Sequence, residues 1–333
     1  MTDLHVFIDT NIWLSFYAYN KDDLEELRKL IALVRKGKLT LYANSQLRDE
    51  FYRNRERKLA ESIRDFSKTN IPKGLPRYMN EYSEAASFRD ALKEAEIQRD
   101  ALTARAKADA QSKSLVADKL FADILKVVQV GQIPQSIVSK ALDRRVRGNP
   151  PGKSNSLGDQ IHWEYLLGEV PDGADLHIVS KDGDFESPLN DGQIEQFLAD
   201  EWQEKKSGGL KLHTELRPFL AEHFPNIKLA IDVEKLDAVE NLVNSGSFAS
   251  THSAIERLSL LIDSLSWQDA ERIFNAGITN RQINWISSDD DVRDFYQLLI
   301  AKYGHKLEGV SQSLLTKYFS EVTLDDLDED IPF

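Results

Sequence analysis

The chain has 333 residues, a net charge of −13 and no cysteine. This length suffices for an α/β domain plus a smaller second domain, and 41% hydrophobic residues can fill a sizeable core. The lack of cysteine excludes disulfides, thiolate metal sites and cysteine nucleophiles. No apolar stretch approaches the roughly 20 residues of a membrane span, and the N-terminus lacks a signal-peptide pattern, so we expect a cytoplasmic protein without a membrane partner.

The net charge argues at first against nucleic-acid binding, because a basic surface is its usual sign. The acidity is uneven, however, and concentrates from residue 211 onward, most densely in the tail EVTLDDLDED. Acidic and basic residues are nearly balanced before that point. Part of the acidity there fits a metal site, where clustered carboxylates stay ionised beside a cation.

The first predicted strand lies in HVFIDTNIWLSF, residues 5–16. Its unbroken β-branched and aromatic run is typical of a strand covered on both faces of a parallel sheet. Asp9 follows this run directly. At the carboxyl edge of an open α/β sheet, such a carboxylate either caps a helix or belongs to a ligand site.

A helical pattern runs from about residue 22 to 35, and KGKLTLYAN predicts a turn and a second strand. Asn44 or Ser45 then caps a helix in which Glu50 shares the inward face with apolar residues, while Asp49 points elsewhere. Residues 83–130 hold few helix breakers, and their first half is poor in large apolar side chains. They predict a solvated helical arm at about 56–130 that shapes access to a site or pairs two copies of the chain.

A basic, Gly- and Pro-rich segment precedes a helix expected near Leu157, and Leu176–Ser180 is predicted to be another strand that ends near acidic residues. EKKSGGL, residues 204–210, is expected to be a flexible linker. The predicted organisation is therefore an α/β domain at 1–205 and an acidic, mostly helical domain at 211–333. The charge of the second domain favours a protein partner over nucleic acid.

Two strands that are distant in sequence thus each precede an aspartate, and Asp9 and Asp182 meet if these strands are central in one parallel sheet. Asp159, which opens a helix, and Glu50 can join them. Four such carboxylates repel one another unless divalent cations bind, and Mg²⁺ or Mn²⁺ prefer these oxygens. Two ions about 4 Å apart can activate a water and stabilise the leaving oxygen of a phosphodiester. The pattern therefore predicts nuclease chemistry that requires no His, Ser or Cys nucleophile.

Four segments, FIDTNIWL, LRDEF, SLGDQIHWEYLL and IVSKDGDF, resemble in this order the acidic motifs of the PIN-domain nucleases. The resemblance covers residues 1 to about 200 and implies a Rossmann-like α/β fold of the larger bacterial form, with a parallel sheet. It also implies a Mg²⁺- or Mn²⁺-dependent hydrolase, with an endoribonuclease in bacterial defence or stress as the favoured activity. The resemblance implies these site residues: Asp9, Glu50, Asp159 and Asp182 as catalytic metal ligands, Asp184 as a further ligand, and Thr10 and Asn11 in support.

One dense basic segment, Lys140–Lys153, leads into the third acidic motif. Its side chains are predicted to contact the phosphates that flank the scissile bond. The predicted nucleic-acid contacts are Arg144, Arg145, Arg147 and Lys153. If they are only solvated, the helix face with Arg53, Arg55, Arg57 and Lys58 is the alternative substrate path.

Other interpretations of these motifs stay open at this point. Asp9 and Asp159 can be helix caps, KDGD can be a turn without chemistry, and His162 is expected to pack within its helix. Toprim-type nucleases need a first strand that ends on Glu, and aspartyl phosphatases need an Asp where this chain has Asn11. The alternatives that stay open are a DNA nuclease of the flap or Toprim-like type and a catalytically idle PIN scaffold that binds protein partners.

Overall fold

The computed structural model describes residues 4–17, 24–68, 74–152 and 156–307. Lys153 and the acidic tail lie outside these ranges. The chain divides into two compact units, Met1–Ile227 and Lys228–Phe333. No helix in the described ranges is long and apolar enough to cross a membrane.

A parallel sheet of order β2-β1-β3-β4 forms the centre of the first unit. Its strands are β1 (His5–Ile8), β2 (Thr40–Tyr42), β3 (Leu176–Val179) and β4 (Leu210–His213). Every residue of β1 and β3 is buried, as their apolar runs predict. The chain leaves β1 toward the edge strand β2, and it leaves β3 toward the opposite edge strand β4. The switch point, where α/β sheets bind ligands, therefore lies between the carboxyl ends of β1 and β3. The predicted α/β fold is confirmed.

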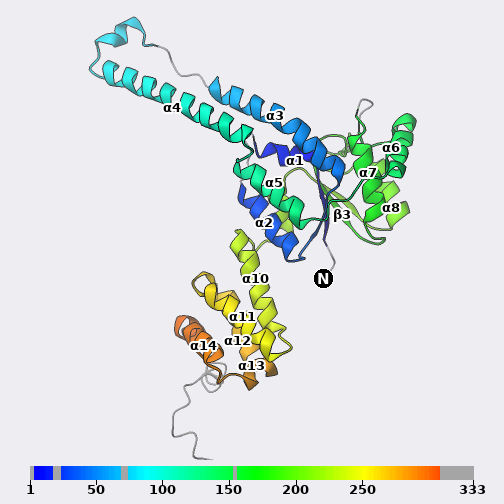
Figure 1. Ribbon diagram of the computed structural model, residues 1–333, viewed down its shortest axis with the longest axis vertical. Helices are drawn as coiled ribbons and strands as arrows, with labels where there is room; N and C mark the ends of the chain where they lie inside the picture. The colour runs from blue at the N-terminus through cyan, green and yellow to red at the C-terminus, as the bar shows by residue number, and fades with distance from the viewer. Residues whose placement is uncertain (1–3, 18–23, 69–73, 153–155, 308–333) are drawn as a thin grey trace, which may run out of the picture. The chain divides into compact units, whose positions relative to one another are not determined.

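Helices cover both faces of this sheet (Figure 1). They are α1 (Thr10–Ser15), α2 (Leu24–Arg35), α5 (Val116–Val127), α6 (Gln135–Arg147), α7 (Gly158–Glu169), α8 (Gln196–Lys206) and α9 (Leu216–His223). On one face, the ring of His162 in α7 lies 5.1 Å from that of Phe7. Val6 is level with His177 in the β1–β3 register, so His177 points to the opposite face from Phe7. There it meets the ring of Phe219 in α9.

A long helical hairpin projects from the sheet and consists of α3 (Ser45–Ser67) and α4 (Ala85–Gln111) (Figure 1). In α4 only Ala85 is buried, which confirms the expected solvated arm. The arm is shorter than predicted, because α5 packs on α2 and buries Phe121 and Ile124 in the body. A short 3₁₀ helix (Arg77–Glu81) precedes α4.

A buried ion pair joins the base of the hairpin to the body. Arg55 Nε donates to Asp118 Oδ1 at 2.5 Å, and the second carboxylate oxygen accepts from Arg55 Nη2. Tyr17 also donates its hydroxyl to Asp118, and Arg55 reaches the carbonyl of Ala110 in α4 at 3.0 Å. Arg55 is 6% exposed, so its charge is neutralised inside the protein and is not offered to a substrate.

The second unit is helical, as predicted. Its helices are α10 (Ala230–Val243), α11 (Phe248–Leu260), α12 (Trp267–Thr279), α13 (Arg281–Trp285) and α14 (Asp290–Tyr303), with 3₁₀ turns at Ile262–Ser264 and Gly304–Lys306. They enclose one apolar core around Phe274, Phe295 and Tyr296.

The boundary between the units falls later than the sequence suggested. Residues 204–210 are not a linker, since α8 continues to Lys206 and β4 begins at Leu210. Between them the chain turns tightly: a Cβ at Gly208 would lie 2.0 Å from the carbonyl oxygen of Ala174. Two glycines here therefore serve a close packing contact, and residues 211–227 belong to the first unit.

Substitution of Asp118 is expected to weaken the first unit strongly. Asp118→Ala leaves the guanidinium of Arg55 buried without its partner, which costs about 3–5 kcal/mol of unfolding free energy in comparable sites. Urea denaturation measures this loss. The double variant Arg55→Met, Asp118→Leu removes both charges and should lose less than the single variant. A single variant as stable as the double one would contradict this role of the pair.

Candidate active site

Asp9 lies at the switch point of the sheet, directly after β1, and is buried. It caps α1, because its Oδ1 accepts the backbone N–H of Thr10 at 2.5 Å. Its Oδ2 accepts from Asn11 Nδ2 and from Ser180 Oγ, both at 2.7 Å. Burial raises the pKa of Asp9, although the hydrogen bonds from Ser180 and from the backbone of Thr10 oppose the shift. Asp9 is therefore both a cap and a carboxylate at the expected ligand edge.

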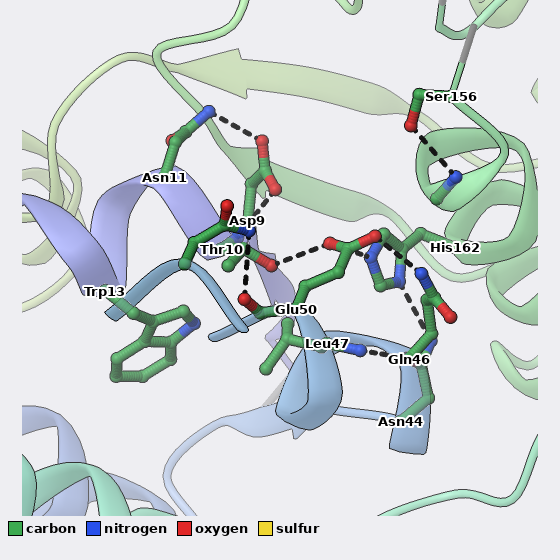
Figure 2. A network of polar contacts seen from close by, with 12 residues as sticks. Asp9, Thr10, Asn11, Trp13, Asn44, Gln46, Leu47, Glu50, Ser156 and His162 are labelled. Carbon is green, nitrogen blue, oxygen red and sulfur yellow. Dashed lines mark hydrogen bonds and ion pairs between the residues drawn. The ribbon is translucent and has the colours of Figure 1, made fainter. Parts of the chain in front are cut away.

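Glu50 points from α3 toward the same edge, as its helix face predicts (Figure 2). Its Oε2 accepts from Thr10 Oγ1 at 3.1 Å, and its Oε1 accepts from Gln46 Nε2 at 2.6 Å. Burial alone would raise the pKa of Glu50, but hydrogen bonds from His162, Gln46 and Thr10 outweigh it and hold the pKa below its usual value. Asp49 faces solvent.

His162 is a site residue that the sequence interpretation missed. The N-cap residue Asn44 accepts the N–H of Leu47 with its Oδ1 at 3.0 Å, so its amide Nδ2 faces His162 Nδ1 at 3.1 Å. Nδ1 is thus the acceptor, and the proton on Nε2 faces Glu50 Oε2 at 3.3 Å. A helix cap therefore sets the tautomer of an imidazole that in turn holds Glu50 (Figure 2).

The expected packing role of His162 is also present, since it is fully buried against Phe7. One sequence signal could have indicated its second role. His162 lies three residues after Asp159 in α7, and residues at this spacing share a helix face. The face that carries Asp159 toward the acids therefore carries His162 there as well.

Asp159 lies in the first turn of α7, close to the other acids. The helix begins at Gly158, where a Cβ would lie 2.0 Å from Glu50 Oε1, so a larger residue here would displace the Glu50 carboxylate. Burial raises the pKa of Asp159 to about 7, and the charge of Asp9 adds to the shift, followed by those of Asp184 and Glu50. The structure thus brings these four acids within electrostatic reach of one another.

The loop after β3 supplies the last acidic motif. Asp184 raises the pKa of both Asp159 and Glu195 by its charge, which ties it to the acidic cluster. Asp182 is oriented by its own backbone, whose N–H donates to Ser180 Oγ at 3.1 Å. The coupling to Asp159 and Glu195 places Asp184, the further ligand of the sequence analysis, with the other acids. The role of Asp182 as a ligand stays a prediction.

The donor set of this edge fits a hard divalent cation. Carboxylate oxygens are the ligands that Mg²⁺ and Mn²⁺ prefer, and burial together with the charges of neighbouring acids raises the pKa of Asp159. In the described ranges, no three acidic side chains bring one ligand atom each within 4.8 Å of one another. This spacing is expected of carboxylates that repel one another.

The basic segment before Asp159 differs in part from its prediction. Arg144 is buried, and it donates to Glu164 at 2.8 Å and to Glu201 at 2.5 Å. Its charge is therefore neutralised inside the protein, which corrects its assignment as a phosphate contact. Arg147 is exposed and Arg145 is partly exposed. The predicted contact Lys153 lies outside the described residues.

A family model of the PIN domain matches residues 6–185, more than half of the chain. The chain belongs to the PIN-domain family. This membership indicates a nuclease-type function, and PIN nucleases in general use divalent metals. The match spans all four acidic motifs and ends one residue after Asp184. The comparisons with curated proteins and with solved structures found no match.

Replacement of Asp159 by asparagine is expected to stabilise the protein when no divalent cation is present. Because folding raises its pKa from 3.8 to about 7, its ionisation opposes folding, and stability falls as pH rises between these values. At pH 8 in EDTA, Asp159→Asn should gain about 1–3 kcal/mol in unfolding free energy. Urea denaturation at pH 8 and pH 4 measures the gain, which should shrink at the lower pH.

The exposed neighbour of Glu50 provides the control, since Asp49→Asn should change stability by no more than about 0.5 kcal/mol. Added Mg²⁺ should stabilise the unsubstituted chain more than Asp159→Asn. If Asp159→Asn were less stable than the unsubstituted chain at pH 8 in EDTA, the electrostatic crowding inferred for this edge would be incorrect.

Proposed function

We propose that this PIN-domain protein is a divalent-metal-dependent nuclease that hydrolyses phosphodiester bonds, with RNA as the favoured substrate. The observation that carries this proposal is the convergence of acids from four separate motifs on one edge of the sheet, where burial and then the charges of Asp9, Asp184 and Glu50 raise the pKa of Asp159. A cluster that only capped helices would not need its carboxylates to approach one another at a cost in stability.

The residues that would hold the cations are Asp9, Glu50, Asp159 and Asp184, with Asp182 as a predicted addition. Bound divalent cations at such a cluster supply activation of the attacking water and stabilisation of the leaving oxygen. The side chains around the acids keep them in place. Asn11 and Ser180 hold the Asp9 carboxylate, and the imidazole of His162 holds Glu50.

Substrate contact is proposed for the loop that leads into α7. An ideal Cβ on Gly152 would lie 3.1 Å from Asp159 Cβ, so the end of this loop passes directly beside an acid of the cluster. Arg147 at the end of α6 and Lys153 flank the loop in sequence. Cations carried on it would meet the phosphates next to the scissile bond.

The arm and the second unit are proposed to provide the protein contacts. We propose that the α3–α4 hairpin pairs two copies of the chain or limits access to the acids, and that the acidic unit binds a protein partner. The hairpin exposes the apolar side chains of Phe88, Ile97 and Leu102 to solvent. Contact with another protein surface would bury them. A role in bacterial defence or stress, in the cytoplasm, completes the proposal by analogy.

Nuclease activity is tested with purified full-length chain on a panel of single-stranded RNA, single-stranded DNA and flap DNA. Cleavage should require Mn²⁺ or Mg²⁺ and stop in EDTA. Asp9→Asn and Glu50→Gln should each lower the rate by more than about 100-fold, beyond the 10–100-fold typical of residues that only orient a ligand. Asp182→Asn and Asp184→Asn, compared side by side, decide which of the two acids contributes.

Asp49→Asn is the matched control, because Asp49 is adjacent to Glu50 but faces solvent, and its cleavage rate should be unchanged. Full activity in Asp9→Asn would refute the assignment of the acids. Complete inactivity of the unsubstituted chain on the whole panel would favour the alternative of an idle PIN scaffold. Cleavage of flap DNA alone would favour the DNA nuclease alternative.

The basic loop generates a separate expectation for binding. Each lost phosphate contact lowers the slope of log affinity against log salt by about 0.7 for a single strand. Arg145→Ala with Arg147→Ala should therefore reduce the slope by roughly 1 to 1.5 units, evenly across sequences. RNA binding is measured over a KCl series in the Asp9→Asn background, which prevents cleavage. The control pair Arg272→Ala with Arg281→Ala removes the same charge from exposed sites of the second unit, and an equal effect of both pairs would argue against the loop.

A further inference from the structure

Three histidines lie together on the sheet face opposite α7. His177 comes from β3, His213 from the end of β4, and His223 from the end of α9. One ring nitrogen of each lies within 4.8 Å of the others. His177 Nδ1 and His213 Nε2 are 2.9 Å apart. In the described ranges, this is the group of three whose spacing suits a single metal ion.

The strand register explains how the first two rings meet. His177 is level with Lys211, and Val179 is level with His213. Side chains two residues apart on a strand share a face, so both imidazoles project to the same side of the sheet. The last residue of α9 then brings the third ring against His177, with ring centroids 4.6 Å apart and planes at 87°.

Ring packing and the hydrogen bond between His177 Nδ1 and His213 Nε2 do not satisfy every nitrogen of this group. His223 Nε2 is buried and has no hydrogen-bond partner, although buried polar atoms are normally paired. Its neighbour Glu222 places Oε1 at 3.9 Å, which is too far for a hydrogen bond. A buried, unpartnered nitrogen on a ring that packs against two other imidazoles is an arrangement that a bound cation would satisfy.

The charge state of the group also suits a metal. Burial, followed by the neighbouring imidazoles of His223 and His213, lowers the pKa of His177 to about 4. Burial lowers the pKa of His213 and His223 as well. These shifts favour the neutral ring, and neutral imidazole is the form that binds metal ions.

We propose that His177, His213 and His223 form a binding site for a transition-metal ion of the zinc class. Imidazole nitrogen is a ligand of Zn²⁺, whereas Mg²⁺ prefers oxygen, so this site and the acidic edge select different ions. Glu222 or a water supplies the fourth ligand of a tetrahedral site. Glu222 Oε2 is 3.9 Å from His213 Nδ1. A small rotation of the Glu222 side chain would make this oxygen a metal ligand or the hydrogen-bond partner of that nitrogen.

This site is separate from the proposed nuclease centre and does not depend on it. The two are joined through one residue, because the backbone N–H of Ser180 donates to the carbonyl of His213 at 2.9 Å while its hydroxyl donates to Asp9. An ion that fastens β3, β4 and α9 together therefore stabilises the strand end beside Asp9. We expect a structural role for it.

The test uses full-length protein with any affinity tag removed, stripped of metal and kept in excess Mg²⁺ to saturate the acidic edge. Zn²⁺ is titrated in competition with a chromogenic chelator, and Co²⁺ is added separately as a spectroscopic probe. We expect one Zn²⁺ per chain, the visible absorption of tetrahedral Co²⁺, and a higher melting temperature with Zn²⁺. His223→Asn and His213→Asn should each weaken Zn²⁺ binding by about 100-fold or more.

His252→Asn is the matched control, because His252 pairs with Asp289 and Asp291 on the surface of the second unit, and Zn²⁺ affinity should be unchanged. Asp9→Asn should also keep the affinity, which separates this site from the acids. Equal Zn²⁺ affinity in His223→Asn and the unsubstituted chain would overturn the proposal. If either histidine variant fails to fold, the unsubstituted chain decides alone, since absence of tetrahedral Co²⁺ absorption would overturn it as well.

Discussion

Negative charge crowded at the switch point of the sheet is the constraint on which the first unit depends. Parallel strands β1 and β3 end side by side, so the acids that follow them share one partly buried edge of the sheet. Burial and mutual repulsion oppose their ionisation, as the pKa of Asp159 records. Hydrogen-bond donors from the surrounding side chains partly offset this cost. Bound divalent cations would neutralise the remaining negative charge.

Those donors come from segments far apart in the chain and form one connected network. Asn44 caps α3 and orients His162, which holds Glu50, while Ser180 at the end of β3 holds Asp9. Helix capping and site geometry are thus the same set of hydrogen bonds. A substitution of the cap residue Asn44 would therefore alter the position of the Glu50 carboxylate, because the groups between them are buried and have few alternative hydrogen-bond partners.

Charge neutralisation inside the protein removes two arginines from the possible substrate contacts. Arg55 and Arg144 are both buried in ion pairs, so their positive charge ties the hairpin and α6 to the body. The histidines on the opposite face of the sheet follow a different chemistry, since they stay neutral and offer nitrogen instead of oxygen. One small sheet therefore carries two potential metal sites of different ligand type.

The sequence by itself determined the elements whose signals are local. The buried strands, the Asn44 cap and the inward face of Glu50 follow from apolar runs, capping chemistry and helix periodicity, and the ordered acidic motifs indicated the family. Only the tertiary structure decided the rest. Residues 204–210, the end of α8 and its turn into β4, were taken for a linker, Arg144 was taken for a phosphate contact, and the meeting of the three histidines was not foreseen. Each of these features depends on strand register or on burial against segments that are distant in the chain. Neither register nor burial can be inferred from the neighbouring residues in the sequence.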